Sequence, residues 1–221
     1  MICYEYINQY IKKLINKNQG ILGDMEEYAH SNHIPIIHLE VANFLSVIGN
    51  MVKPKKILEI GTAIGYSAIF MSGFLETGGS IDTIERNYEM VDLAKENIKK
   101  AQLEDVIHVL IGDALNVLRC LDKKYDMIFL DGAKGKYSEF LPECLRMLNP
   151  SGVLISDNVL FKGMVASDDL VVRRNKTIVY RMKKYLFDIS NHEELITSII
   201  PIGDGVSLSF KHRFKGAKLL P

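Results

Sequence analysis

The amino-acid sequence predicts an α/β fold: a doubly wound, mostly parallel sheet that ends in an antiparallel hairpin and follows several N-terminal helices. Three observations carry this prediction. The chain opens with helical patterns only, its middle alternates short apolar runs with helical patterns, and its last two apolar runs are separated by a short turn. Strands and helices in alternation indicate a parallel sheet that helices cover on both faces.

The N-terminal part shows helical periodicity. The segment YEYINQYIKKLI places Tyr6, Tyr10 and Leu14 on one helix face, and two more helical patterns cover 23–32 and 38–51. Because no linker rich in Pro, Gly or Ser divides the 221 residues, we expect a single domain. Its expected parts are a helical cap, a core and a tail, at 1–52, 53–212 and 213–221.

Strand candidates follow in order along the core. They are KILEI (56–60), SIDTIE (80–85), VIHVLI (106–111), YDMIFLD (125–131) and GVLISD (152–157). Helical patterns such as YEMVDLAKENIKKA and YSEFLPECLRML lie between them, and a polar helix is expected near 169–187. The last runs, ELITSII and VSLSF, are joined by PIGDG, and a turn this short connects only antiparallel strands.

Composition argues against several classes of protein. Lys plus Arg and Asp plus Glu both number 27, so the overall charge does not favour a polyanionic partner. From residue 162 onward, however, the chain has eleven basic and six acidic residues. The three cysteines are far apart and suit neither a disulfide framework nor a zinc site. No signal peptide or membrane-spanning run is visible, so we expect a cytoplasmic protein without a membrane partner.

The turn after the first strand, EIGTAIGYS, is rich in glycine. Gly61 and Gly65 are not followed by the lysine of a phosphate-binding P-loop. A dinucleotide-binding turn has a glycine where Ala63 stands, so an NAD-dependent oxidoreductase is the weaker alternative. Taken alone, such a turn could also serve only to pack a helix against a strand.

Three acidic residues at strand ends suit one particular ligand. In a doubly wound sheet, ligands bind beyond the carboxyl ends of the strands. There Glu59 could accept a hydrogen bond from an ammonium group, Glu85 could bind both ribose hydroxyls, and Asp113 could reach an adenine amino group. A nucleoside that carries a cationic amino acid has all these groups, and it is S-adenosylmethionine.

Two further strand ends predict a metal site. Asp131, Asp157 and Asn158 offer three hard oxygen ligands without a neighbouring cysteine or histidine, which favours Mg²⁺ or Mn²⁺. Either aspartate alone could instead cap a helix. A substrate hydroxyl bound to the cation would lose its proton more easily, and Lys134 is close enough in sequence to assist in accepting it.

Seven segments in order resemble the motifs of the cation-dependent O-methyltransferases, of the catechol and caffeoyl-CoA type. They are EIGTAIGYS, IERN, GDA, YDMIFLDGAKGKY, ISDNVLFKG, KTIVYRM and PIGDG, and the resemblance extends from about residue 20 to 212. Within the family, the chain looks closest to the bacterial branch that includes the tRNA 5-hydroxyuridine methyltransferase. The resemblance implies a class I methyltransferase with a Rossmann-like core, and a homodimer.

The resemblance also implies roles for individual residues. The metal ligands would be Asp131, Asp157 and Asn158, with Asp131 and Lys134 as catalytic residues. The methyl donor would be held by the backbone near Ile37 and by Glu59, Gly61, Ser67, Glu85, Asp113, Ala114 and Asp131. Gly132 is one departure, since alanine is expected there.

The acceptor is expected to carry two adjacent oxygens, because three protein ligands leave metal positions open. Both a catechol and 5-hydroxyuridine meet this condition. The segment VVRRNKTIVYRMKKYL has six basic residues and no acid, and its Arg173, Arg174 and Lys184 are candidates for binding RNA. We therefore expect methylation of 5-hydroxyuridine in tRNA to 5-methoxyuridine. A small catechol-like or caffeoyl-CoA-like phenol is the alternative, and a non-catalytic nucleoside-binding module is a weaker one.

Overall fold

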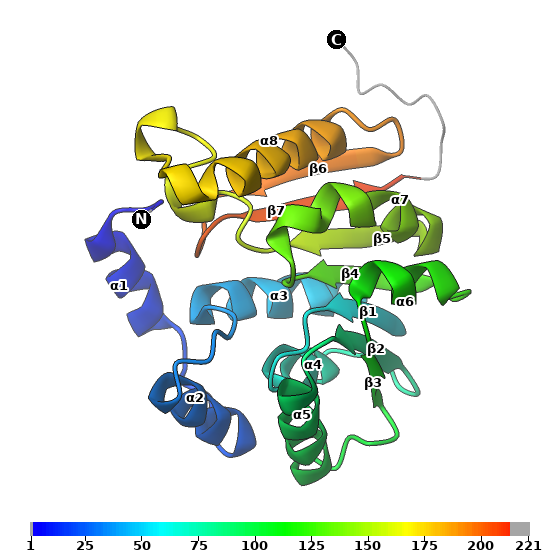
Figure 1. Ribbon diagram of the computed structural model, residues 1–221. Coiled ribbons are helices and arrows are strands. Elements are labelled where there is room, and N and C mark those ends of the chain that lie inside the picture. Colours follow the sequence, from blue (N-terminus) through cyan, green and yellow to red (C-terminus); the bar gives the residue numbers. More distant parts are fainter. Residues whose placement is uncertain (1, 213–221) are drawn as a thin grey trace.

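The computed structural model describes residues 2–212, and within them one seven-stranded sheet organises the protein (Figure 1). Its strands are β1 Lys56–Ile60, β2 Ser80–Glu85, β3 Ile107–Ile111, β4 Tyr125–Leu130, β5 Leu148–Ser156, β6 Leu195–Ile200 and β7 Val206–Lys211, in the order β3-β2-β1-β4-β5-β7-β6. Neighbours from β3 to β5 are parallel, whereas β7 is antiparallel to both β5 and β6. The predicted fold class is confirmed. The predicted tail, 213–221, lies outside the described residues.

Helices cover both faces of the sheet. One face carries α2 Ile21–Ser31, α3 Leu39–Val52, α4 Tyr66–Ser72 and α5 Tyr88–Lys100, and the other carries α6 Ala114–Cys120, α7 Tyr137–Met147 and α8 Lys176–Ser190. The first helix, α1 Glu5–Leu14, has no buried residue and lies beside the sheet rather than on it (Figure 1). Among the described residues, no helix has both the length and the apolar character needed to cross a membrane.

Side-chain alternation along the strands builds a separate core on each face. In β1, Ile57 belongs to the core beneath α2–α5, while Leu58 and Ile60 belong to the core beneath α6–α8. All three are almost completely buried, and burial of one such side chain stabilises a fold by about 1.5–3 kcal/mol. Because successive side chains of a strand point to opposite faces, Glu59 faces the same side as Ile57.

The polar helix expected near 169–187 is shorter than predicted. It begins at Lys176 as α8, and it is preceded by two short 3₁₀ turns, η3 Asp168–Leu170 and η4 Arg173–Asn175. Val171 and Val172 between these turns are extended, a conformation that suits β-branched residues. Arg173 and Arg174 therefore lie in a turn and not on the helix.

Candidate active site

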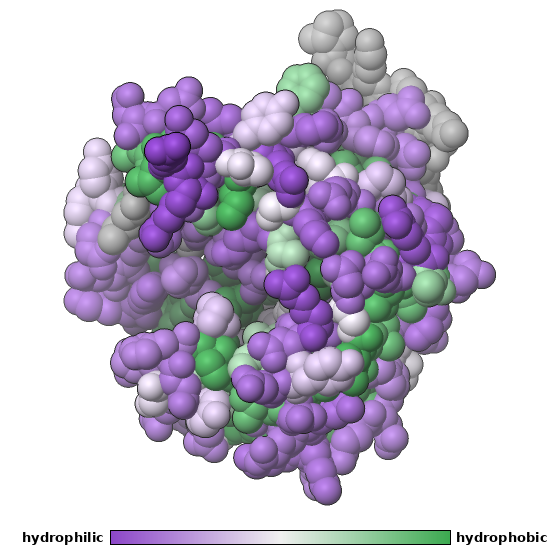
Figure 2. Space-filling model, viewed as in Figure 1, coloured by the Kyte–Doolittle hydropathy of each residue, from purple (hydrophilic) through white to green (hydrophobic). Residues whose placement is uncertain are grey.

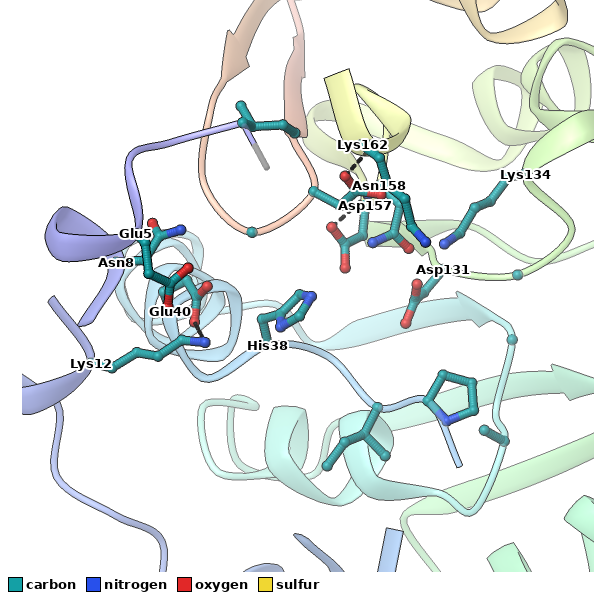
Figure 3. Close-up of a pocket in the computed structure, with 18 of the residues that line it drawn as sticks. Glu5, Asn8, Lys12, His38, Glu40, Asp131, Lys134, Asp157, Asn158 and Lys162 are labelled. Carbon is teal, nitrogen blue, oxygen red and sulfur yellow. Dashed lines mark hydrogen bonds and ion pairs between the residues drawn. The ribbon is translucent and has the colours of Figure 1, made fainter. Parts of the chain in front are cut away.

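A cavity of about 660 Å³ opens at the carboxyl ends of β1, β4 and β5 (Figure 3). Its inner wall contains Gly61, Glu85, Asp131, Lys134, Asp157 and Asn158. Its outer wall comes from distant parts of the chain, namely Glu5, Asn8 and Lys12 of α1, then His38, Glu40, Lys162 and Asp204. In the view of Figure 2, a hollow separates α1 from the body of the protein, and hydrophilic residues form most of its rim.

The ends of β4 and β5 carry the two predicted metal-binding aspartates. Asp131 and Asp157 follow these strands directly, and β4 pairs with β5 in parallel up to Leu130 and Ser156. Below them, the buried Tyr137 hydroxyl lies 3.0 Å from the carbonyl oxygen of Leu130 and 3.2 Å from that of Asp157. Tyr137 thereby fixes the separation of the two strand ends.

Burial and nearby negative charge raise the pKa values of these two carboxylates. Burial, followed by the charge of Asp157, raises the pKa of Asp131 well above its usual range. Burial also raises the pKa of Asp157 to about 6, while the Asn158 N–H and the charges of Lys134 and His38 oppose the shift. Two buried carboxylates that repel each other would be stabilised by a cation between them.

The donor set fits Mg²⁺ or Mn²⁺, although it contains only two carboxylates. Among the described residues, no group of three His, Cys, Asp or Glu side chains is arranged to hold a metal. The predicted third ligand is an amide oxygen, from Asn158, whose φ of 58° lies in the left-handed region that asparagine tolerates better than most residues. Carboxylate and amide oxygens suit a hard divalent cation, with water and substrate as its remaining ligands.

Lys134 begins a short 3₁₀ turn, η1 Lys134–Lys136, after the left-handed Ala133. It lines the cavity, and its charge lowers the pKa of both Asp131 and Asp157. Three of the predicted catalytic and metal-binding side chains thus interact electrostatically in one space.

Two glycines bring the turn after β1 against the turn after β4. Gly61 has a φ of +107°, and a Cβ atom there would lie 2.8 Å from the backbone nitrogen of Gly132. A Cβ atom on Gly132 would lie 2.9 Å from the Cα atom of Gly61. Side-chain carbons do not pack this close to backbone atoms, so the alanine expected at position 132 would force these turns apart. Glycine at 132 therefore has a structural reason in this chain.

Glu85 is held rigidly at the end of β2. Its Oε2 accepts a hydrogen bond from the Ala63 N–H at 3.1 Å, and its Oε1 accepts from the N–H groups of Arg86 and Asn87 at 2.9 Å each. Glu85 and Gly61 also line a second cavity of about 140 Å³. This second cavity therefore continues the first at the donor side.

The second cavity contains the other predicted donor-binding residues, Asp113 and Ala114. Asp113 caps α6 by accepting hydrogen bonds from the N–H groups of Leu115 and Asn116. Its other carboxylate oxygen lies 3.2 Å from the Nζ atom of Lys136, and this contact lowers the pKa of Asp113. Its carboxylate is thus already engaged at the position predicted for an adenine amino group.

Three predicted donor-binding residues do not reach either cavity wall. Ile37 is buried between Ile36 and His38, which do line the large cavity. Glu59 is buried on the face beneath α2–α5, because of the alternation along β1, and Ser67 is buried on α4 of the same face. Glu59 accepts a hydrogen bond there from the Thr83 hydroxyl, at 2.5 Å. Burial raises the pKa of Glu59 to about 7, although the hydroxyls of Ser67 and Thr83 lower it.

The predicted RNA-binding residues also lie away from the two cavities. Arg173 and Arg174 are exposed in η4, and the Lys184 ammonium lies 2.6 Å from the Asp188 carboxylate on α8. None of the three lines either cavity.

Several cavity residues were not predicted from the sequence. Lys162 and Asp204 lie within the quoted segments ISDNVLFKG and PIGDG, but the second was interpreted only as a turn. The Asp204 carboxylate accepts a hydrogen bond from the Lys162 N–H, and its charge raises the pKa of Asp157. Glu40 and the residues of α1 have no sequence signal, since only tertiary packing brings them to the cavity.

Comparisons with known proteins agree with this geometry. Residues 15–212 match the family model for O-methyltransferases. A catechol O-methyltransferase of Niastella koreensis is 29% identical over 173 residues, covering 75% of this chain and 78% of that protein. A caffeoyl-CoA O-methyltransferase of Populus kitakamiensis is 30% identical over 208 residues, covering 90% and 83%.

Solved structures share the fold. A Staphylococcus aureus protein, named provisionally as a caffeoyl-CoA O-methyltransferase, superposes with a TM-score of 0.86 and 31% identity, covering 94% of this chain and all of that one. An O-methyltransferase from Bacillus cereus, in complex with SAH, superposes with a TM-score of 0.83 at 24% identity, covering 93% and 97%. The predicted resemblance to the catechol and caffeoyl-CoA type is confirmed. The chain therefore belongs to the O-methyltransferase family and is an S-adenosylmethionine-dependent O-methyltransferase.

Proposed function

We propose that this enzyme methylates one of two adjacent oxygens on a small phenol, of the catechol or caffeoyl-CoA kind, with Mg²⁺ or Mn²⁺ as its cofactor. One observation carries the proposal: Asp131, Asp157 and Lys134 line the same cavity as Gly61 and Glu85. Groups suited to the acceptor and to the methyl donor therefore share one space. The substrates in the names of the two relatives support the acceptor class.

Asp131, Asp157 and Asn158 would hold the cation. When bound, a divalent cation stabilises the negative charge of a deprotonated acceptor oxygen. The two carboxylates are already buried close together, so they need little rearrangement to bind it.

Lys134, as the free amine, would accept the proton of the acceptor hydroxyl. Its position after the Asp131 turn puts it on the acceptor side of the cavity (Figure 3). The acceptor oxygen then forms a bond to the methyl carbon while the bond from that carbon to the donor sulfur breaks. Alignment of the two reactants supplies most of the acceleration, and no covalent enzyme intermediate is needed.

Glu85 would orient the methyl donor by accepting hydrogen bonds from its ribose hydroxyls. The three backbone N–H groups that hold this carboxylate fix its direction before the donor binds. A fixed acceptor loses less conformational entropy on binding than a mobile one.

Methylation of 5-hydroxyuridine in tRNA is the second candidate. Arg173 and Arg174 favour it, because they are exposed and, among the described residues, neither takes part in an ion pair. The other half of the basic segment is already neutralised. Its Arg181, Lys183 and Lys184 pair with Glu139, Asp168 and Asp188, respectively. The small phenol is therefore the first candidate. The homodimer and the cytoplasmic location stay predictions.

The test is a direct assay with S-adenosylmethionine and catechol, followed by mass spectrometry of the product. Methyl transfer should stop in EDTA and return with Mg²⁺ or Mn²⁺. Full activity in EDTA would contradict the metal site. If catechols are not methylated but tRNA that contains 5-hydroxyuridine is, the second candidate replaces the first.

A further inference from the structure

The outer wall of the cavity contains a carboxylate that the proposed chemistry does not use. Glu40 lies in the first turn of α3 and faces the Lys12 side chain of α1 across the cavity rim (Figure 3). His38, which belongs to the same wall, lies between Glu40 and the predicted metal ligands (Figure 3). An acceptor held at the metal ligands would therefore extend past His38 toward Glu40.

The Glu40 carboxylate is buried but incompletely paired. Its side chain is only 9% exposed, and its Oε2 atom has no hydrogen-bond partner among the described residues. The Lys12 Nζ atom lies 3.7 Å from this oxygen, which is too long for a hydrogen bond. A buried carboxylate oxygen without a hydrogen bond is unfavourable, so a donor group that reaches it would be bound selectively.

Lys12 covers Glu40 only loosely. Its side chain is 46% exposed, and it belongs to a helix without any buried residue. Apart from backbone hydrogen bonds to its own N-cap residue Tyr4, the only hydrogen bond or ion pair between α1 and the other described residues is the Lys12–Glu40 ion pair. A bound molecule can therefore reach the Glu40 carboxylate after a small displacement of the lysine.

We propose that Glu40 determines acceptor specificity by accepting a hydrogen bond from an amine or hydroxyl substituent of the phenol. This substituent lies on the side of the ring away from the two adjacent oxygens. The inference rests on the proposed function, because it places those oxygens at Asp131, Asp157 and Asn158.

The negative charges of this wall should favour some substituents of the phenol and disfavour others. Glu5 and Glu40 both line it, so an acceptor with a carboxylate arm would meet like charge. An apolar arm would cover the Glu40 carboxylate without supplying a hydrogen bond. Amine and hydroxyl arms supply that bond, and the amine adds opposite charge.

The test compares kcat/KM for catechol with that for catechols bearing ethyl, aminoalkyl, hydroxyalkyl and carboxyalkyl arms at the 4-position. Aminoalkyl and hydroxyalkyl arms of one to three carbons are included, so that at least one arm is long enough to reach the Glu40 carboxylate. The parent enzyme should prefer its best amine or hydroxyl substrate over 4-ethylcatechol by roughly tenfold, or about 1.4 kcal/mol, mainly through KM.

Two variants make this test specific. Glu40→Ala should remove the preference, because kcat/KM should fall for the amine and hydroxyl substrates more than for catechol and 4-ethylcatechol. Glu27→Ala is the matched control, because Glu27 is exposed on α2 and lines neither cavity. The control should keep the preference. Lys12→Met should keep it as well, since the carboxylate remains.

Three results would overturn the inference. The parent enzyme could show no preference between arms, or Glu40→Ala could lose activity equally on every acceptor, which would make Glu40 only an anchor for α1. A preference for the carboxyalkyl arm that Lys12→Met abolishes would assign recognition to Lys12 instead. If the parent methylates no catechol at all, the proposed function itself has failed, and this inference fails with it.

Discussion

The donor side and the acceptor side of the cavity are built in different ways. The donor side consists of the end of β2 with Glu85 and of the turns that follow β1, β3 and β4, with Gly61, Asp113 and Lys136. The acceptor side combines the ends of β4 and β5 with α1, Glu40 and the β6–β7 turn. Donor binding is therefore encoded in short local segments, whereas acceptor binding depends on how distant parts of the chain pack together. Variants on the two sides should have separable effects.

The largest effect is expected from removing a metal ligand. Asp157→Ala should lower kcat by about 10³-fold, because the acceptor loses the charge that stabilises its anion. Isothermal titration calorimetry should give a dissociation constant for S-adenosylmethionine within about twofold of the parent value. A large loss of donor affinity would show that the two sides are not separable.

Two neighbouring lysines offer a sharper comparison. Lys134→Ala should lower kcat by about 10²–10³-fold while the donor still binds, since Lys134 assists the proton transfer. Lys136 contacts Asp113 in the second cavity, so Lys136→Ala should instead weaken donor binding and leave kcat near the parent value. Stopped-assay kinetics with both substrates varied would separate the two effects. If both variants lost kcat and donor affinity to the same extent, the assignment of Lys134 to the acceptor side and Lys136 to the donor side would be wrong.

A pH-dependent effect on stability is expected from Glu59, below the donor turn. Its folded-state pKa of about 7 lies above the ordinary value of 4.5, so the stability it contributes is present below pH 4.5 and lost as the pH rises through 7. The parent should lose about 3 kcal/mol more than Glu59→Gln between pH 4.5 and pH 8. Urea unfolding in EDTA at both pH values measures this difference. The contribution of Asp157 occurs in both proteins and cancels, and that of Asp131 cancels largely, because burial and the charge of Asp157 raise its pKa more than Glu59 does.

Removing the donor-side carboxylate should have a moderate effect. Glu85→Ala should weaken binding of S-adenosylmethionine by about 1.5–3 kcal/mol, the usual contribution of a hydrogen bond to a charged group. The value of kcat at saturating donor should change much less. Calorimetry and initial rates on the same preparation would check both statements, and an unchanged dissociation constant would remove Glu85 from the donor site.

The smallest effect on catechol is expected from the exposed arginines. Reversing the charge of Arg173 and Arg174 should change catechol methylation by less than about twofold, because neither residue lines the cavity. If tRNA is the substrate, the same variant should lose most of its tRNA activity, and the parent activity should fall steeply with salt. Reversal at Lys184, which is already paired with Asp188, serves as the control.

The sequence predicted the cavity residues at strand ends better than those of the outer wall, for a physical reason. A strand followed by Gly61 or Glu85 is a local pattern, so its position in the fold follows from the strand alone. Glu40 shows the opposite case, because nothing near it in the sequence indicates that α1 will cover it. Glu59 shows a third case: the sequence places it near the end of a strand, but the alternation along that strand turns its side chain away from the cavity.

The position of β7 between β5 and β6 has a consequence for the order of events during synthesis. A nascent chain contains β1, β2, β3 and their turns long before it contains β7. Until β7 arrives, β5 keeps an open edge that can pair with another strand. Because β6 pairs only with β7 among the described strands, pulse-labelled hydrogen exchange during refolding should find the amides of β6 and β7 protected together. Docking of the β6–β7 hairpin then closes the exposed edge of β5 and completes the acceptor pocket in the same event.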